Sequence, residues 1–203
     1  MIRFIVGTDT DAGKTFYGRQ LARKGACVIK PIETGFNSFK DISQSDAYGY
    51  SEIMGKNLEE INTYFFTVPA SPHLAAEIDQ VQVDVDRVKV FILTQYRKCC
   101  EKNKKDGSCL SFFVELAGGL MVPLTRSFNQ LDLIREINEE EEVGVDLVVG
   151  NKLGCINHAL MTITLLRNAN IRIQHLEINN YGKRPDLIML DNAKVIREYL
   201  QSN

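Results

Sequence analysis

The start of the chain constrains the fold most strongly, because an apolar run, a glycine-containing turn and a helical pattern follow one another directly. The apolar run Ile2–Val6 predicts a buried strand, and the turn Gly7–Thr15 ends in Gly-Lys-Thr. We expect a helix over Lys14–Lys24. This order is typical of a P-loop, in which backbone N–H groups and a helix N-terminus bind phosphate. The sequence therefore predicts a site for ATP or GTP.

The turn supplies side chains as well as backbone to this site. Lys14 can reach the terminal phosphates, and the Thr15 hydroxyl can bind magnesium. The usual pattern has four residues between the first glycine and Gly-Lys-Thr, but Gly7 lies one position further back and Thr8 fills the expected place. A chance Gly-Lys-Thr in a turn is the alternative. The residues that we assign to nucleotide binding here are Asp11, Ala12, Gly13, Lys14, Thr15 and Phe16.

The composition of the chain indicates which kinds of molecule it is suited to bind. The 203 residues are 44% hydrophobic, and we expect one domain over residues 1–203. A formal net charge of −2 argues against nucleic acid or an anionic membrane surface as a partner, since both select a basic surface. The five cysteines show no metal-ligand spacing and suggest reduced thiols. The start of the chain shows no targeting segment, so we expect a cytoplasmic protein that acts on small molecules.

Strand and helix patterns alternate along the rest of the chain, which predicts an α/β fold. We expect a three-layer P-loop NTPase fold, with a mostly parallel sheet and helices on both faces. The further predicted strands are Cys27–Ile29, Cys109–Val114, Val145–Val149 and Ile171–Ile178. The further predicted helices are 43–54, 73–78, Val85–Lys102, Gln130–Asn138, 156–170 and 191–200, with a solvated turn at Lys102–Gly107.

Polar residues cluster where the predicted strands end. Lys30 follows the second predicted strand, and Glu115 follows the third. P-loop NTPases bind magnesium through an acidic residue at the end of such a strand, so Glu115 is a magnesium candidate. Asp46, at the start of a predicted helix, is a further candidate for binding magnesium. The alternative is that its carboxylate occurs there only because the helix dipole stabilises a negative charge in the first turn. Because ligands of parallel sheets bind at the carboxyl ends of strands, we expect these residues to share one site.

Six motifs together resemble those of the dethiobiotin synthetases, and the resemblance covers nearly the whole chain. The shifted first glycine is that family's own form. The motifs are Gly7-Thr8-Asp9-Thr10 with Gly13-Lys14-Thr15, Lys30-Pro31 with Thr34-Gly35, Ser45-Asp46-Ala47, Ser71-Pro72-His73, Glu115 with Ala117-Gly118-Gly119, and Lys152-Leu153-Gly154-Cys155-Ile156-Asn157-His158-Ala159.

The resemblance implies that diaminopelargonic acid, CO2 and magnesium ATP give dethiobiotin, ADP and phosphate in biotin synthesis. An amine traps CO2 as a carbamate, ATP phosphorylates the carbamate, and the second amine closes the ring with loss of phosphate. The resemblance also implies a homodimer with shared active sites. Each step builds negative charge, so the site needs fixed cations and N–H donors rather than a covalent nucleophile.

The resemblance further implies a role for individual residues. Lys14, Lys30 and Thr10 would act in catalysis, and Thr15, Asp46 and Glu115 would hold magnesium. Glu115 and Asn179 would also contact the nucleotide, Asn179 at its base. In the dimer, the helix that begins near Cys155 and Asn157 would bind the substrate carboxylate of the other subunit. The substrate-binding residues implied are Thr34, Pro72, Val122, Cys155 and Asn157.

The chain departs from the family pattern at two places. The family usually has Glu-Gly-Ala-Gly-Gly, whereas Leu116 here introduces a side chain after Glu115. Longer members continue into a Gly-Glu-Ile-Pro segment that helps cradle adenine, whereas this sequence stops at Asn203. From the second departure we expect weak nucleotide affinity or relaxed base preference.

Two other functions fit the same loop. A partitioning-type P-loop switch ATPase would carry an additional lysine early in the loop, but residues 8–12 contain none. A related amide-forming ligase with another amine or acid is also possible on fold and loop alone, because these do not select a substrate.

Overall fold

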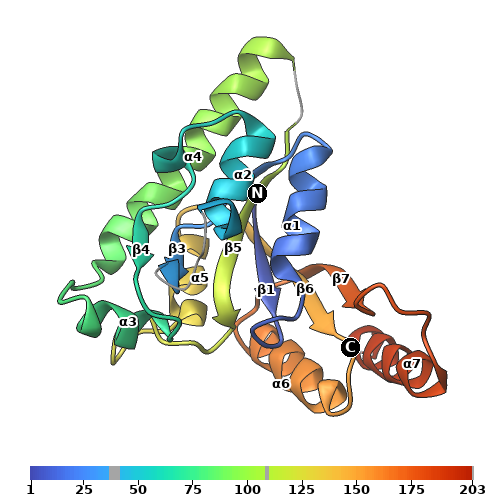
Figure 1. The fold of residues 1–203 in the computed structure, drawn as a ribbon. Helices are drawn as coiled ribbons and strands as arrows, with labels where there is room; N and C mark the ends of the chain where they lie inside the picture. Colours follow the sequence, from blue (N-terminus) through green and yellow to red (C-terminus); the bar gives the residue numbers. More distant parts are fainter. Residues whose placement is uncertain (37–41, 108–109, 203) are drawn as a thin grey trace.

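The computed structural model describes residues 1–36, 42–107 and 110–202 (Figure 1). Within them, five strands form one sheet in the order β2-β5-β1-β6-β7. Every neighbouring pair is parallel, which confirms the predicted parallel α/β architecture. The strands are β1 (Ile2–Gly7), β2 (Cys27–Ile29), β5 (Phe112–Gly119), β6 (Val143–Gly150) and β7 (Ile173–Asn179).

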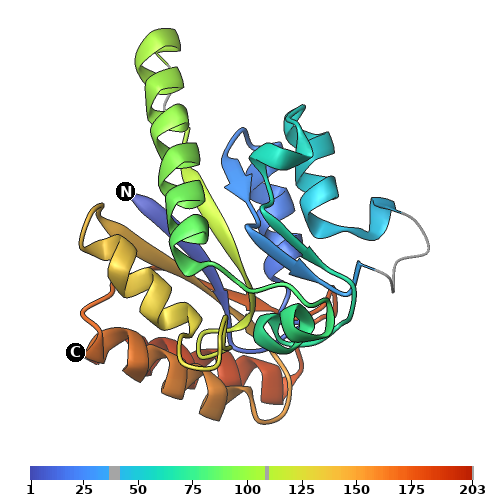
Figure 2. The same ribbon diagram turned by 90° about the vertical axis from the view of Figure 1, so that its left-hand side faces the viewer.

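Helices cover both faces of this sheet. Figure 2 shows α1 and α2 on one face and α4, α5 and α6 on the other, and α7 packs against α6. The helices are α1 (Lys14–Arg23), α2 (Asp46–Met54), α3 (Pro72–Ile78), α4 (Val85–Asp106), α5 (Gln130–Asn138), α6 (Cys155–Asn168) and α7 (Leu187–Gln201), with short 3-10 turns η2 (Ile42–Gln44) and η3 (Leu58–Glu60). No helix in this part of the chain is long and apolar enough to cross a membrane.

Local sequence signals account for several helix ends. Ser45 caps α2 by accepting a hydrogen bond from the Tyr48 N–H at 3.1 Å. The predicted helix Gln130–Asn138 is confirmed as α5, and Asn129 caps it through a reciprocal pair with Asp132.

The structure corrects the bounds of two predicted elements and adds a pair of short strands. The segment Lys102–Gly107, predicted as a solvated turn, continues α4 to Asp106, and Gly107 ends the helix in the left-handed conformation. No element was predicted for Ile32–Thr34, which forms strand β3 and pairs in parallel with β4 (Tyr64–Phe66). The predicted strand Cys109–Val114 begins at Phe112 and continues to Gly119, so Glu115 lies within β5 and does not follow it, and Cys109 lies outside the described residues.

A buried charge sits among the apolar side chains of the sheet. Asp146, in β6, has no exposed surface. Arg3 donates to its Oδ1 from Nε at 2.9 Å, and the Tyr17 hydroxyl donates to its Oδ2 at 2.6 Å. Arg3 also lies over the ring of Phe113 at 4.8 Å from the centroid. These contacts tie β1, α1 and β6 together around one carboxylate, which would be costly to bury unpaired.

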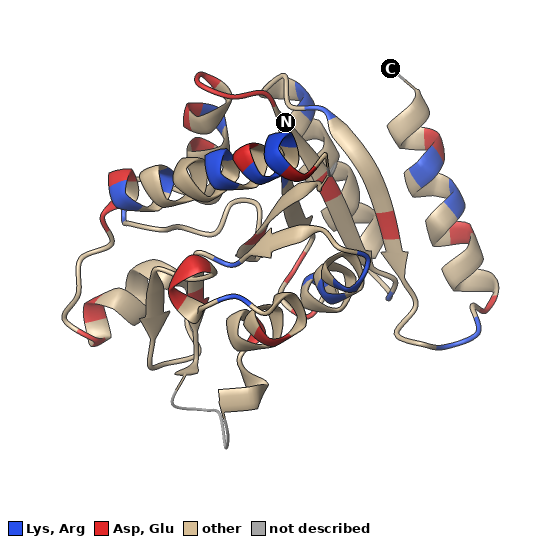
Figure 3. Cartoon of the chain, turned by 90° about the horizontal axis from the view of Figure 1, so that it is seen from above, with Lys and Arg blue, Asp and Glu red and all other residues tan. Residues whose placement is uncertain are grey.

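We predict that Arg3→Met lowers the free energy of unfolding by about 3 kcal/mol, because it leaves the buried Asp146 without its cation. Urea denaturation of the purified protein measures this change. Lys194→Met is the matched control, since Lys194 and Glu198 form an exposed pair on α7, where Figure 3 shows both charge signs interspersed. The control should shift stability by less than about 0.5 kcal/mol. Equal effects of the two substitutions would contradict the prediction.

Candidate active site

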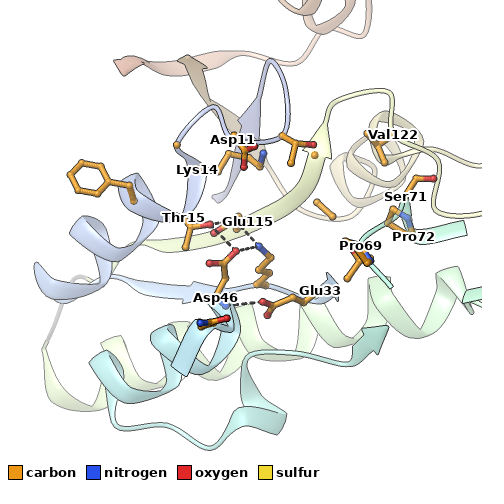
Figure 4. A pocket seen from close by; sticks show the side chains of 18 of the residues that line it. Asp11, Lys14, Thr15, Glu33, Asp46, Pro69, Ser71, Pro72, Glu115 and Val122 are labelled. Atoms are coloured by element: carbon orange, nitrogen blue, oxygen red, sulfur yellow. Dashed lines mark hydrogen bonds and ion pairs between the residues drawn. The ribbon is translucent and has the colours of Figure 1, made fainter. Parts of the chain in front are cut away.

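A cavity of about 1130 Å³ opens at the carboxyl ends of the strands. It lies beside the P-loop, and the ends of β2, β5 and β7 contribute residues to it (Figure 4). The predicted site residues that line it are Thr10, Asp11, Gly13, Lys14, Thr15, Phe16, Lys30, Thr34, Asp46, Pro72, Glu115, Val122 and Asn179. Residues far apart in the sequence therefore share one cavity, as the strand-end argument predicted.

The P-loop conformation explains the displaced glycine. Lys14 Nζ donates to the Asp9 carbonyl at 3.0 Å, so its side chain runs back across the start of the loop. A Cβ atom on Gly7 would lie 2.7 Å from that carbonyl oxygen and 2.8 Å from Lys14 Nζ. Gly7 is therefore required by the path of Lys14, whereas position 8 accepts a threonine.

The second half of the P-loop, at Ala12 and Gly13, is in contact with Asn179 at the end of β7. Gly13 has φ of 104°, a left-handed value that favours glycine, and a Cβ atom there would lie 2.2 Å from Asn179 Nδ2. Asn179 donates to the Ala12 carbonyl at 3.0 Å. Ala12 is itself buried and does not line the cavity. Asn179 thus contacts the loop directly, in addition to the base contact that the resemblance implies.

Four side chains meet deeper in the cavity. Lys30 Nζ lies 2.5 Å from Asp46 Oδ2 and 2.9 Å from Glu115 Oε1. Thr15 Oγ1 lies 2.9 Å and 2.8 Å from the same two oxygens, so its single proton can be donated to only one of them at a time. The four groups come from α1, the end of β2, α2 and β5.

Charge and burial shift the pKa values of these groups in different directions. Burial, reinforced by the nearby Lys30 cation, lowers the pKa of Lys14 below its ordinary value. Burial acts in the same direction on Lys30, but the carboxylates of Glu115, Asp46 and Glu33 outweigh it and raise the pKa. Burial would raise the pKa of Asp46, yet the charge and hydrogen bond of Lys30 hold it low. Lys30 therefore stays a fixed cation at neutral pH.

Two supporting residues were not identified from the sequence. Glu33 is buried and accepts hydrogen bonds from Ser45 Oγ at 2.9 Å and from the Asp46 and Ala47 N–H groups at 2.7 and 3.0 Å. It thereby fixes the first turn of α2, which carries Asp46. Its proximity depends on the β3–β4 pairing, which the sequence analysis did not predict.

Tyr50 is the second supporting residue. Its hydroxyl donates to Glu115 Oε2, and burial together with the Glu115 charge raises the Tyr50 pKa well above its ordinary value. A Cβ atom on Gly18 would lie 2.1 Å from the Tyr50 hydroxyl, so this glycine lets α1 pass close enough for the contact. In the sequence, Tyr50 is an aromatic residue inside a predicted helix, and no local signal distinguishes it from Tyr48.

The structure shows where the Leu116 side chain lies, which the sequence left open. Its side chain is 4% exposed and belongs to the hydrophobic core, whereas Glu115, Ala117 and Gly118 line the cavity. Alternate residues of a strand point to opposite faces, so the leucine packs away from the site. The extra side chain does not enter the cavity.

Two predicted substrate residues lie outside the cavity. Cys155 and Asn157 are in the first turn of α6, after the left-handed Gly154. Cys155 is 2% exposed, and its Sγ contacts Asn151 Oδ1 at 3.8 Å, whereas Asn157 is exposed. Within this chain, the two residues are not brought together with Lys14 and Lys30.

The oxygen donors of the cavity fit magnesium. Thr15, Asp46 and Glu115 bring one hydroxyl and two carboxylates to a common point, marked by the dashed contacts in Figure 4. No group of three or more His, Cys, Asp or Glu side chains suited to a metal is found in residues 1–36, 42–107 and 110–202. Magnesium does not need such a group, because it commonly takes one or two carboxylates and completes its shell with phosphate and water.

Comparison with known proteins shows the broad class of protein to which this chain belongs. The family model described as AAA domain matches residues 3–202, so the chain belongs to this family. The crystal structure of a ParA family ATPase from Chlorobium tepidum TLS has a TM-score of 0.52 at 10% identity, covering 98% of this chain and 80% of that one. This likeness establishes a shared fold only. The fold and the loop together define a P-loop NTPase.

Sequence relatives then identify the particular family. The ATP-dependent dethiobiotin synthetase BioD of Legionella pneumophila strain Paris is 38% identical over 191 residues, which cover 93% of this chain and 83% of that protein. The protein of the same name from Fusobacterium nucleatum is 34% identical, covering 95% of this chain and 84% of its own. This chain belongs to the ATP-dependent dethiobiotin synthetase family.

We predict that Gly7→Ala weakens the binding of a non-hydrolysable ATP analogue about tenfold, or about 1.4 kcal/mol, because the new methyl group displaces Lys14 and the Asp9 carbonyl. Isothermal titration calorimetry measures the dissociation constant. Gly119→Ala is the control, since a methyl group there would meet its nearest neighbours at 3.7 Å. The explanation for Gly7 would be wrong if its substitution left the affinity at the control value.

Proposed function

We propose that this protein catalyses the ATP-dependent carboxylation and ring closure of diaminopelargonic acid with CO2, forming dethiobiotin, ADP and phosphate. The observation that carries the proposal is the convergence of two lysines, a hydroxyl and two carboxylates on one cavity beside a P-loop. Membership of the dethiobiotin synthetase family supports the choice of substrate. Bicarbonate would serve as the source of CO2.

The proposed reaction has three steps, each of which places negative charge in the cavity. An amine of the substrate attacks CO2 and loses a proton, giving a carbamate. A carbamate oxygen then attacks the γ-phosphorus of ATP, and ADP leaves. Finally the second amine attacks the carbonyl carbon of this carbamic-phosphoric anhydride, phosphate leaves, and the ureido ring closes. Fixed cations lower the barriers because they stabilise the developing charge without reorganising.

Residues of the cavity would divide this work. Lys14 would neutralise the transferring phosphoryl group, and Lys30, held charged by its two carboxylates, would face the carbamate. Thr10 and Thr34, which line the same cavity, would donate or accept hydrogen bonds with the carbamate and the diamine. Pro72 and Val122 would contact the aliphatic part of the substrate.

Magnesium and the nucleotide would occupy the loop side of the cavity. Thr15, Asp46 and Glu115 would hold magnesium, which supplies positive charge to the phosphate oxygens when bound. Asn179 would contact the base, and Asp11, Ala12, Gly13 and Phe16 would contribute to the phosphate and nucleotide contacts. The Lys30 ammonium group pairs with the same two carboxylates and offsets part of their charge.

A homodimer would complete the substrate site. Asn157 is exposed at the start of α6, where free N–H groups can bind a carboxylate, but the helix start does not line this chain's own cavity. A second copy would place this helix end against the substrate tail. Cys155 would support this helix start by packing, since its side chain is buried and its N–H donates to the Lys152 carbonyl at 3.0 Å.

The alternative of a partitioning-type switch ATPase shares the fold with this chain, but the residues give it less support. The loop lacks the additional early lysine, and Lys30, which is paired with Asp46 and Glu115 beside the loop, would face the carbamate of a second substrate. An amide-forming ligase with another substrate would use the same residues. Only substrate dependence separates these functions.

We predict that phosphate release from magnesium ATP requires both diaminopelargonic acid and bicarbonate, and that dethiobiotin forms in equal amount. A coupled phosphate assay with product detection by mass spectrometry measures both quantities. Phosphate release that ignores the diamine would favour the switch ATPase. Release that depends on a different amine or acid would favour the related ligase.

We predict that Lys14→Ala and Lys30→Ala each lower kcat by about two orders of magnitude or more, because both lysines act on charge that develops in the transition state. Lys194→Ala, on the exposed surface of α7, is the control and should leave kcat unchanged. Thermal unfolding of each variant separates catalysis from stability, since Lys30→Ala also leaves two carboxylates without their cation. Near-normal turnover of a folded variant would remove that lysine from the mechanism.

A further inference from the structure

A second cavity lies at the other end of β2 from the proposed active site. Its volume is about 690 Å³. Cys27 begins β2 and lines this cavity, whereas Lys30 follows the last residue of β2 and lines the first one. The second cavity contains none of the residues to which we assign a role in dethiobiotin formation. An activity here would therefore be independent of the proposed function.

Two thiols and an ammonium group meet in the wall of this cavity. Lys56 Nζ lies 3.2 Å from Cys27 Sγ, and Cys99, whose thiol donates to the Leu110 carbonyl at 3.8 Å, lines the same cavity. Cys27 belongs to β2 and Cys99 to α4, so the cavity brings together two cysteines that are distant in the sequence. Both cysteines are free and nearly covered by protein, but both border the cavity, which gives a small molecule access to them.

The surroundings favour a negative charge on Cys27. The neighbouring Cys99 thiol and the charge of Lys56 outweigh burial and the nearby Glu60, and they lower the pKa of the Cys27 thiol to about 6. The neighbouring Cys27 and burial raise the pKa of Cys99, which stays protonated. The remaining charged groups of the cavity are all basic, namely Arg23, Lys98 and Lys102. A thiolate beside a protonated thiol is the arrangement that reacts with peroxides.

We propose that Cys27 and Cys99 form a two-thiol oxidation site for small hydroperoxides, with Cys27 as the nucleophile and Cys99 as the resolving thiol. The Cys27 thiolate attacks the hydroperoxide, the O–O bond breaks, and the sulfur becomes a sulfenic acid while the alkoxide takes a proton from water. Cys99 sulfur then attacks the sulfenic sulfur, and its proton leaves with the hydroxyl group as water. The two thiols lose two electrons in total, and the hydroperoxide is reduced to an alcohol, or to water when it is hydrogen peroxide.

The proposal is tested on the reduced full chain with hydrogen peroxide, followed by alkylation and peptide mass spectrometry. We expect a peptide linked through Cys27 and Cys99, with the loss of two hydrogen atoms. Cys99→Ser should stop the reaction at a Cys27 sulfenic acid that dimedone traps. Cys100→Ser and Cys155→Ser are matched controls and should retain the link. If Cys27 stays reduced while other cysteines are oxidised, or if it links to a different cysteine, the proposal is overturned.

The pH dependence of alkylation tests the role of Lys56 without any oxidation. Iodoacetamide should modify Cys27 of the wild-type protein with a half-maximal rate near pH 6, because the thiol is unreactive below its pKa. Lys56→Gln, which removes the ammonium group, should shift this midpoint to higher pH. An ordinary cysteine midpoint near about pH 8.5 in both proteins would contradict the assignment of Cys27 as a stabilised thiolate.

Discussion

The candidate active site depends on one buried cation, the Lys30 ammonium group held between Glu115 and Asp46. A lysine this deeply buried is tolerated only when its charge is paired, because desolvation of a lone ammonium ion is costly. The cation also stabilises the two carboxylates, since they would repel each other without it. The carboxylates raise the pKa of Lys30, which is thus kept charged in a place where a lone ammonium ion would be neutralised.

Sheet topology brings these charges together. The strand order β2-β5-β1 places β5, which carries Glu115 near its middle, between β2 and the strand that leads into the P-loop. Glu115 can therefore contact Lys30 on one side and Thr15 on the other. Asp46 comes from outside the sheet, and Glu33 fixes it by accepting the first N–H groups of α2. Tyr50 then restrains the second oxygen of Glu115.

Much of this arrangement could be predicted from the sequence, because it follows from short-range patterns and one rule of parallel sheets. The P-loop is contiguous, and β1, β2 and α5 have strong local signals, so their positions were predicted closely. Lys30 and Glu115 were placed in one site because both follow apolar strands. That argument needs only the parallel direction of the strands and no knowledge of their order.

The parts that were missed depend on tertiary contacts. Strands β3 and β4 have three residues each and are stabilised by pairing with one another, so neither stands out in the sequence. Glu33 and Tyr50 owe their roles to that pairing and to the close approach of α1 and α2 at Gly18. The direction of Leu116 was likewise undetermined until the register of β5 placed it in the core.

The fold of this protein does not by itself determine which reaction it catalyses. A ParA family ATPase shares the fold at 10% identity, so the layered sheet and its loop are compatible with very different sequences. The residues that would distinguish a carboxylating ligase from a switch lie outside the loop, at Lys30, Thr34 and Glu115. Lys30 and Thr34 lie at or just after the ends of β2 and β3, and Glu115 lies within β5, but all three line the cavity. The same framework can therefore acquire a second substrate by changing a few positions, because the phosphate site is built largely from backbone and stays in place.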